Sequence, residues 1–293
     1  MCDISVTNRT IPEKDNRLLL FQGFLKESGV SPNTVTVYTA SARLYFSLYD
    51  ELTMNNLLSY KQYLIQHYKA ATANARIYGI NQYIRQYGEG LEVPLETYRL
   101  PSVKQQQKMF LDNVISQTDY ERLKKGLKQD HNMFWYFVVR FLCSSGARIS
   151  ELLQIKVEHV RMGYMDLCSK GGKIRRIYFP ESLCTEGLQW LESNGVSSGF
   201  LFTNRSGQPI SPRGISLQLK ALARRYGVPE NTVYPHSFRH RFAKNFLNRF
   251  NDIALLADLM GHESVETTRI YLKRSSDERK RQITECIEKP PAF

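Results

Sequence analysis

The chain has 293 residues, of which 42% are hydrophobic, so it is long enough for one large domain or two of ordinary size with real cores. No run of 18 or more apolar residues is present and Met1–Lys14 is polar and acidic, so we expect neither a membrane span nor a secretion signal. The 40 Lys and Arg residues outnumber the 28 Asp and Glu residues. A net charge of +12 fits a polyanionic partner such as nucleic acid, and taken alone fits a merely soluble basic protein equally well.

The five cysteines argue against a cysteine-based site. Their number is odd and no two form a CxxC pair, so we expect neither a disulfide framework nor a zinc site. A reducing, cytoplasmic location is the simplest interpretation. The cysteines are Cys2, Cys143, Cys168, Cys184 and Cys286.

The positive charge is concentrated in the second part of the chain. Residues 1–100 hold 10 Lys and Arg against 9 Asp and Glu, whereas residues 101–293 hold 30 against 19. If DNA is the partner, the stronger electrostatic attraction is therefore expected from the second part.

The first hundred residues predict a small helical bundle. Apolar residues recur at helical spacing in a helix that ends at Gly29 and in a second that begins at Ser31–Pro32, where serine caps and proline opens the first turn. Two further helices are predicted over 53–68 and 71–87, which makes four in all.

Tyrosines are frequent on these four helices, and most are expected to be core or half-buried residues. The alternative is that some hydroxyl groups contact DNA phosphates together with nearby basic side chains. The tyrosines are Tyr38, Tyr45, Tyr60, Tyr63, Tyr78 and Tyr83, and the basic residues are Arg43, Lys61, Lys69 and Arg76.

Residues 88–110 have the composition of a linker. Gly88, Gly90, Pro94 and Pro101 interrupt the helical periodicity, and the polar stretch 104–108 is expected to be extended. Such a segment either helps to enclose a bound duplex or serves only as a tether.

A second domain is predicted from about Asp112, mainly helical with one small hairpin. A short helix around 119–123 and a buried helix over 131–145 come first. Residues 164–179 change to the period of a β-hairpin, with a glycine turn between Lys170 and Lys173. Further helices are expected near 181–193, 213–226, 236–249, 252–260, 265–272 and 275–288. The predicted fold class is therefore mainly α with a small β-hairpin, in two domains.

Three sequence clusters supply the groups needed for phosphodiester exchange without a metal, which are a nucleophile, fixed cations, an acid and a base. The first is Gly-Ala-Arg148-Ile-Ser-Glu-Leu, in which the guanidinium can bind two phosphate oxygens. The second is His236-Ser-Phe-Arg239-His, whose first and fourth residues share one helix face. The third is Leu-Met-Gly-His262, followed nine residues later by Tyr271.

These clusters together resemble the tyrosine recombinase family, also called phage integrases, which includes the Xer proteins. The resemblance is close over about 112–288. It implies a helical core-binding (SAM-like) domain over 1–100, a linker over 101–111, and a catalytic domain with a C-terminal helix over 112–293. The family pattern Arg…Lys…His-x-x-Arg…His/Trp…Tyr matches Arg148, Lys170, His236, Arg239, His262 and the nucleophile Tyr271.

The resemblance also implies a mechanism and partners. Tyr271 attacks the scissile phosphate, the arginines and His262 hold its oxygens, and His236 helps in proton transfer. Lys170 protonates the leaving 5′ oxygen, so that a 3′-phosphotyrosine forms without metal or other cofactor. The expected partner is double-stranded DNA with inverted core sites, because the extra domain that binds arm sites in larger phage integrases is not seen. A homo-tetramer is expected on DNA through the C-terminal helix, with Ile283 and Ile287 as anchors.

Further basic residues are expected to contact DNA, and several assignments stay open. Lys173 rivals Lys170, Arg148 alone fits an ion pair with Glu151, and His240 fits a structural or backbone-contacting role. The full set predicted to bind DNA is Arg43, Lys61, Lys69, Arg76, Lys104, Lys173, Arg175, Arg213 and Arg241.

The biological role favoured by the motif sequences is integration of a mobile element. Phe238 and the Arg-Ile-Tyr-Leu-Lys-Arg ending depart from the usual Xer sequences. The alternatives are a Xer-like resolvase of chromosome or plasmid dimers, a type IB topoisomerase, and a non-catalytic DNA-binding protein. The complete set of six catalytic residue types argues against the last of these.

Overall fold

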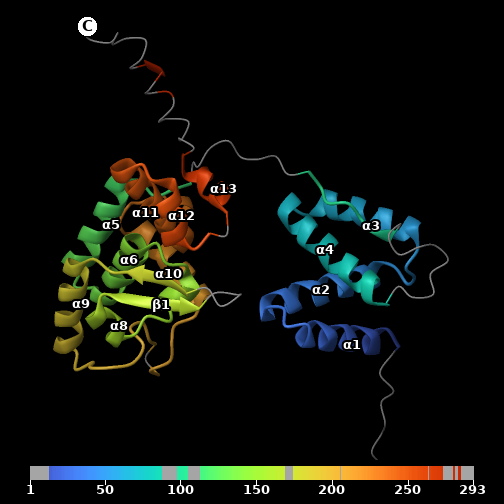
Figure 1. Ribbon diagram of the computed structural model, residues 1–293, viewed down its shortest axis with the longest axis horizontal. Coiled ribbons are helices and arrows are strands. Elements are labelled where there is room, and N and C mark those ends of the chain that lie inside the picture. The colour runs from blue at the N-terminus through green and yellow to red at the C-terminus, as the bar shows by residue number, and fades with distance from the viewer. Residues whose placement is uncertain are drawn as a thin grey trace, which may run out of the picture. The chain divides into compact units, whose positions relative to one another are not determined.

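The computed structural model describes residues 13–87, 98–104, 113–168, 174–204, 206–262, 264–272, 280 and 283–284. The chain divides into two compact units, Met1–Gln107 and Lys108–Phe293 (Figure 1). None of the helices in these described ranges is both long and apolar enough to cross a membrane.

The first unit contains the four predicted helices: α1 (Glu13–Glu27), α2 (Pro32–Leu48), α3 (Met54–His67) and α4 (Ala70–Tyr87). The Oγ of Ser31 caps α2 by accepting from the backbone N–H of Thr34 at 3.1 Å. The Oγ1 of Thr53 caps α3 in the same way, accepting from Asn56 at 3.2 Å. Both caps satisfy backbone donors that a helix leaves unpaired at its first turn.

Three of the predicted tyrosines form the core of this unit. Tyr45, Tyr60 and Tyr83 are almost completely buried. The hydroxyl of Tyr45 donates to the carbonyl of Glu51 at 2.8 Å, and that of Tyr60 donates to Ser41 at 3.2 Å. These hydroxyl groups are therefore used inside the bundle, whereas Tyr78 is exposed on α4.

Residues 98–104 lie along α4 instead of leaving the bundle as a free tether. Asn81 exchanges two hydrogen bonds with the backbone of Leu100, at 2.9 and 3.0 Å. Asn74, two helical turns earlier, does the same with Val103 at 3.0 and 2.7 Å. The two side-chain amides replace the backbone partner that an extended segment would have in a sheet.

The second unit is mostly helical, and the predicted fold class is confirmed. Its helices are α5 (Gln117–Gln129), α6 (Met133–Ser145), α7 (Ile149–Leu152), α8 (Val157–Met162), α9 (Glu181–Ser193), α10 (Pro212–Arg225), α11 (Pro235–Phe250), α12 (Ile253–Met260) and α13 (Val265–Thr268). Short 3-10 turns cover Glu230–Thr232 and Arg269–Leu272. Strands β1 (Tyr164–Cys168) and β2 (Ile174–Tyr178) pair antiparallel, with Met165 opposite Ile177 and Leu167 opposite Arg175.

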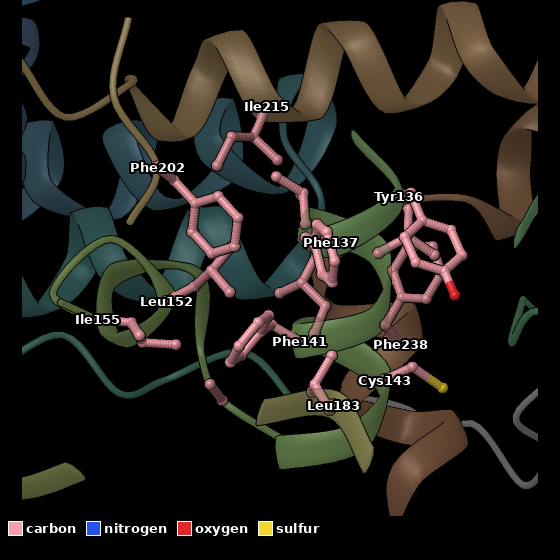
Figure 2. Packing of buried hydrophobic residues seen from close by; sticks show 14 of the residues in the cluster. Tyr136, Phe137, Phe141, Cys143, Leu152, Ile155, Leu183, Phe202, Ile215 and Phe238 are labelled. Atoms are coloured by element: carbon pink, nitrogen blue, oxygen red, sulfur yellow. The ribbon is translucent and has the colours of Figure 1, made fainter. Parts of the chain in front are cut away.

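The core of the second unit is built around α6. Figure 2 shows Phe137, Phe141 and Phe202 meeting at its centre, and all three are almost completely buried. The rings of Phe141 and Phe202 lie edge to face with their centroids 5.8 Å apart. This core fixes the C-terminal end of α6, where the first of the three sequence clusters begins.

The structure differs from the predicted elements at α8 and over 265–272. Helix α8 was not predicted, because six residues between turns carry too little periodicity to stand out. The helix expected over 265–272 is a short α-helix followed by a 3-10 turn. Most of the helix expected near 275–288 lies outside the described residues.

The paired asparagines of α4 give a stability prediction. We expect Asn74→Ala to lower the free energy of unfolding by about 1–3 kcal/mol, because it leaves the partly buried N–H and carbonyl of Val103 without their side-chain partners. Urea denaturation would measure the change. Asn55→Ala, at an exposed position on α3, is the control and should change it by less than about 0.5 kcal/mol. An equal effect of the two substitutions would contradict the role given to Asn74.

Candidate active site

The first cluster is positioned by the end of α6. Gly146 terminates the helix with φ +63°, and a Cβ there would lie 2.5 Å from the ring of Phe242, so both conformation and space require glycine. The chain then turns into α7, whose first residue follows Arg148. The backbone N–H of Arg148 donates to Oε2 of Glu151 at 2.7 Å, and its guanidinium donates to Oε1 at 2.7 Å. The ion pair considered from the sequence is therefore present.

The second cluster opens α11. Pro235 occupies the first turn and His236 is exposed beside it, while Arg239 is 1% exposed. The Arg239 guanidinium donates to the carbonyls of Gly146 and Met260, the latter at 2.6 Å. Burial, reinforced by the neighbouring Arg148, lowers the pKa of Arg239 to about 10, so it stays charged at neutral pH.

The third cluster follows α12. Gly261 ends the helix with φ +62° and turns the chain so that the Nε2 of His262 lies 3.2 Å from the Arg239 guanidinium. The other ring nitrogen of His262 lies 2.8 Å from the hydroxyl of Thr268. Burial and then the positive charges of Arg239 and Arg148 lower the pKa of His262 to about 4. His262 is therefore neutral at neutral pH.

Tyr271 is held in the 3-10 turn Arg269–Leu272 and is 4% exposed. Its ring is nearly parallel to that of His262, with centroids 6.1 Å apart. The ring of His240 lies 5.2 Å away on another side, and His236 in turn contacts His240 at 4.4 Å. Burial raises the pKa of Tyr271 although Arg239 opposes the shift, so the phenol is protonated and needs a proton acceptor to act as a nucleophile.

Glu151 and Arg175 connect these clusters by hydrogen bonds. Glu151 is 8% exposed and also accepts from Arg175, whose guanidinium nitrogens lie 3.2 Å from Oε1 and 2.9 Å from Oε2. Burial would raise the pKa of Glu151, but the backbone N–H of Arg148 and the two guanidinium groups hold it below its usual value. The carboxylate is therefore ionised, and it links two arginines from different elements.

The structure thus brings together five of the six residues predicted to be catalytic: Arg148, His236, Arg239, His262 and Tyr271. Lys170 lies outside the described residues, as does its rival Lys173. His240, expected to be structural or to contact the DNA backbone, lies beside Tyr271 with its Nδ1 buried and without a hydrogen-bond partner among the described residues. Only its place in the second cluster, directly after Arg239 and one helical turn after His236, hinted at this position.

Arg175 was predicted to contact DNA, but its side chain points into the protein. Only 11% of it is exposed, and it donates to Glu151 and to the carbonyl of Met260 at 2.7 Å. A signal was available in the sequence, because Arg175 and the buried Ile177 are two residues apart on one strand and so share a face. This placement favours a role in organising the site over contact with a phosphate.

The other basic residues predicted to bind DNA occupy varied positions. Arg43, Lys69, Lys104 and Arg213 are exposed, while Lys61 is half-buried. Arg76 is half-buried and stacks over the ring of Tyr68 at 4.6 Å. The Nε of Arg241 donates to the carbonyl of Ile115 at 2.7 Å, which ties α11 to the residues just before α5. Across the described residues, no three His, Cys, Asp or Glu side chains are grouped so that they could hold a metal ion.

Comparison with known proteins identifies the family. Residues 113–278 match the Phage integrase family, and they span more than half of the chain. The chain belongs to this family. It is an enzyme of the tyrosine recombinase class.

Relatives resemble this family member along most of its length. The tyrosine recombinase XerA of Pyrococcus furiosus is 27% identical over 276 residues, covering 92% of each chain. The tyrosine recombinase XerD of Listeria innocua is 27% identical over 281 residues, covering 90% of this chain and 81% of the relative.

Solved structures share the recombinase fold. The Tn1549 transposon integrase in complex with transposon right-end DNA has a TM-score of 0.66 at 15% identity, covering 93% of this chain and 99% of that one. The lambda integrase tetramer bound to a Holliday junction has a TM-score of 0.68 at 14% identity, covering 87% and 76%.

The lowered pKa values of His240 and His262 predict how the stability of the protein changes at acidic pH. Burial lowers the pKa of His240, like that of His262, to about 4, and His236, Arg239, Lys244 and His262 add to the shift. In the unfolded chain the pKa is about 6.5, so between these values the unfolded state binds more protons. The free energy of unfolding should therefore fall as the pH is lowered from about 6.5 towards 4.

We expect His240→Asn, which cannot take up that proton, to remove about 3 kcal/mol of this fall between about pH 7 and pH 4. Urea denaturation at several pH values would measure it. A mutant with the same pH dependence as the wild type would show that His240 is not buried in its neutral form.

Proposed function

We propose that this protein cuts and rejoins DNA at specific sites through a 3′-phosphotyrosine link formed by Tyr271. The observation that carries the proposal is the grouping of a buried tyrosine with Arg148, Arg239 and His262 from three separate elements.

The cations of the site match the charge that develops during the reaction. Attack on a phosphodiester places additional negative charge on the non-bridging oxygens, and fixed guanidinium groups stabilise it without rearranging. Arg148 is partly exposed, so its side chain can move to bind the phosphate. Arg239 is held by the carbonyls of Gly146 and Met260, so it would bind the phosphate without moving. The Nε2 of His262 accepts from the Arg239 guanidinium and so helps to fix its direction beside the site.

Each proton in the proposed step has a donor and an acceptor. The phenol proton of Tyr271 passes towards His236 at the mouth of the site as the bond from the phenol oxygen to phosphorus forms. The bond from phosphorus to the 5′ oxygen breaks, and Lys170 gives that oxygen a proton. A 5′ hydroxyl from a partner strand reverses the step, so the energy of the bond is kept in the ester and no further energy source is required.

Helix α10 offers a surface suited to reading DNA. Arg213, Leu217, Lys220 and Arg224 are exposed at spacings of four, three and four residues, which forms one stripe along the helix. An α-helix fits the major groove, where a leucine can contact thymine methyl groups and basic side chains can contact guanine or phosphate. In the first unit, the exposed Arg43 and Lys69 are suited to phosphate contacts.

For the biological role, we propose integration and excision of a mobile element at inverted core half-sites. The support is the motif sequence around Phe238 and Tyr271 and the fold shared with the Tn1549 transposon integrase. Resolution of chromosome or plasmid dimers is the second candidate, favoured by the end-to-end similarity to XerA and XerD. Amplification across a circular junction of the DNA flanking the gene would support the first, and accumulation of chromosome dimers in a deletion strain would support the second.

We further propose assembly of a homo-tetramer on DNA through the C-terminal segment. A groove of about 290 Å³ lies between β2, α11 and α12, lined by apolar side chains that include Phe179, Phe242, Phe246 and Leu259. Ile283, in the described part of the C-terminal segment, is 61% exposed and has the apolar character this groove would accept from a second copy. The lambda integrase structure is a tetramer on a Holliday junction, which agrees with such an assembly for this family.

The nucleophile can be tested with a nicked (suicide) substrate cut from DNA near the gene. We expect the wild type to form an SDS-resistant protein–DNA adduct and Tyr271→Phe to form none, because phenylalanine lacks the attacking oxygen. Tyr226→Phe, which loses only a hydrogen bond to Asp130, should retain the adduct. An adduct that persists in Tyr271→Phe would assign the wrong nucleophile, and tight binding without any wild-type adduct would favour a non-catalytic DNA-binding protein.

The assembly can be tested separately. We expect Ile283→Asp to bind a single half-site normally but to lose the four-subunit complex on full sites, because a charge cannot enter the apolar groove. Mass photometry on DNA would count the subunits. Thr284→Asp places the same charge at the next, also exposed position, and should leave assembly intact. Equal assembly by both variants would contradict the proposed docking.

A further inference from the structure

Glu151 is the shared acceptor of two arginines that differ in accessibility. Arg148 donates to it at 2.7 Å and Arg175 at 2.9 and 3.2 Å, while Arg239 lies 4.0 Å away. The side chain of Arg148 is 42% exposed and that of Arg175 is 11% exposed. Only Arg148 of this pair can therefore leave the carboxylate and reach a bound substrate.

Arg175 is confined where it lies. Besides its two bonds to Glu151, it donates to the carbonyl of Met260 at 2.7 Å. The next residue, Gly261, packs so closely that a Cβ there would lie 2.4 Å from the Cδ of Arg175. The guanidinium is therefore enclosed between the carboxylate and the turn that carries His262.

The charges of the site explain why such an arginine is needed. An ionised carboxylate close to a phosphate-binding site repels the phosphate and competes for the arginine that should bind it. If Arg148 were the only partner of Glu151, binding the phosphate would leave a buried carboxylate unpaired, which is strongly unfavourable. A second, immobile cation removes both difficulties.

We propose that Arg175 is a positioning residue, the permanent counter-ion of Glu151 that frees Arg148 to bind the scissile phosphate. This inference rests on the proposed function of the site. When the phosphate arrives, the Arg148 side chain exchanges its bond to Glu151 for a phosphate oxygen. The carboxylate stays satisfied by Arg175 and by the backbone N–H of Arg148, which keeps α7 in position.

The test measures cleavage of the nicked substrate at saturating protein, with DNA affinity measured separately. Arg175→Met keeps a long side chain but removes the charge, so Glu151 should hold Arg148 and repel the phosphate. We expect the cleavage rate to fall roughly 10- to 100-fold, as is typical for outer partners of catalytic groups, with DNA affinity changed only a few-fold.

A second substitution separates charge compensation from a purely structural role. Glu151→Gln keeps an acceptor for the Arg148 backbone but removes the negative charge. The double variant Arg175→Met/Glu151→Gln should recover most of the rate lost in Arg175→Met and approach that of Glu151→Gln alone. A scaffold that merely lost its hydrogen bonds would not be rescued by losing a further ion pair.

Arg140→Met is the matched control. Arg140 is also a mostly buried arginine paired with a glutamate, Glu186, in the same unit, but none of its contacts involves the site. It should lower thermal stability without changing the cleavage rate. If Arg175→Met does not fold, Arg175→Lys, which keeps the charge without the planar fork, should cleave within about 10-fold of wild type.

The possible outcomes are distinct. Wild-type cleavage by Arg175→Met, or a double variant as slow as Arg175→Met, would overturn the inference. So would a rate for Arg175→Lys as low as that expected for the Met variant. Absence of an adduct with the wild type would instead refute the proposed function and would say nothing in favour of Arg175.

Discussion

The buried guanidinium of Arg239 is the constraint around which the second unit is arranged. A charge that is 1% exposed is tolerated only when it is partnered. Here the two terminal nitrogens of the guanidinium meet the end of α6 at Gly146 and the end of α12 at Met260, with His262 alongside, while the buried Nε has no partner among the described residues. Helix ends have free carbonyls, so two helices that stop at the same place provide what the guanidinium needs. The positive φ angles of Gly146 and Gly261 let both helices stop there and expose those carbonyls. One buried cation therefore joins segments separated by more than a hundred residues.

The same arrangement explains how much of the site was accessible from the sequence. Most of the helices and the hairpin were predictable from periodicity. The resemblance of local clusters to a known family pointed to Arg148, His236, Arg239, His262 and Tyr271, which the structure brings together, whereas Lys170 lies outside the described residues. Arg175 was assigned to DNA because a basic residue beside a glycine turn resembles a solvated one, and its partner Glu151 is 24 residues away in the chain. The contact between His240 and Tyr271 depends on how the 3-10 turn packs against α11, which no local pattern encodes. The position of residues 98–104 was likewise not predictable from local sequence, because they are attached to α4 by the side chains of Asn74 and Asn81, which are distant in the chain.

The tyrosine-rich first unit contrasts with the second in how it uses polar groups. Tyr45 and Tyr60 direct their hydroxyl groups to backbone carbonyls of the same bundle, so they stabilise the unit and are not available to DNA. Its basic side chains are few and mostly at the surface, in agreement with its near-neutral composition. In the second unit two of the cations, Arg239 and Arg175, lie inside the protein beside a tyrosine and two neutral histidines, while others such as Arg213 and Lys220 stay at the surface. The second unit therefore has an internal positive potential that the described part of the first unit lacks, in addition to its surface charge.

That internal potential is unfavourable for the protein alone. Burial first, and then this potential, hold the pKa of His240 and His262 near 4 and that of Arg239 near 10, so added positive charge is disfavoured there. Glu151 offsets only one of the three arginine charges. An anion entering the site would relieve this repulsion, and a phosphate that gains charge during attack would relieve it further, so the stabilisation grows along the reaction coordinate. The same anion would raise the pKa of the neighbouring imidazoles, which would make them better acceptors for the Tyr271 proton once DNA is bound. Electrostatic strain in the free protein and proton transfer in the complex are thus two consequences of one cluster of buried cations.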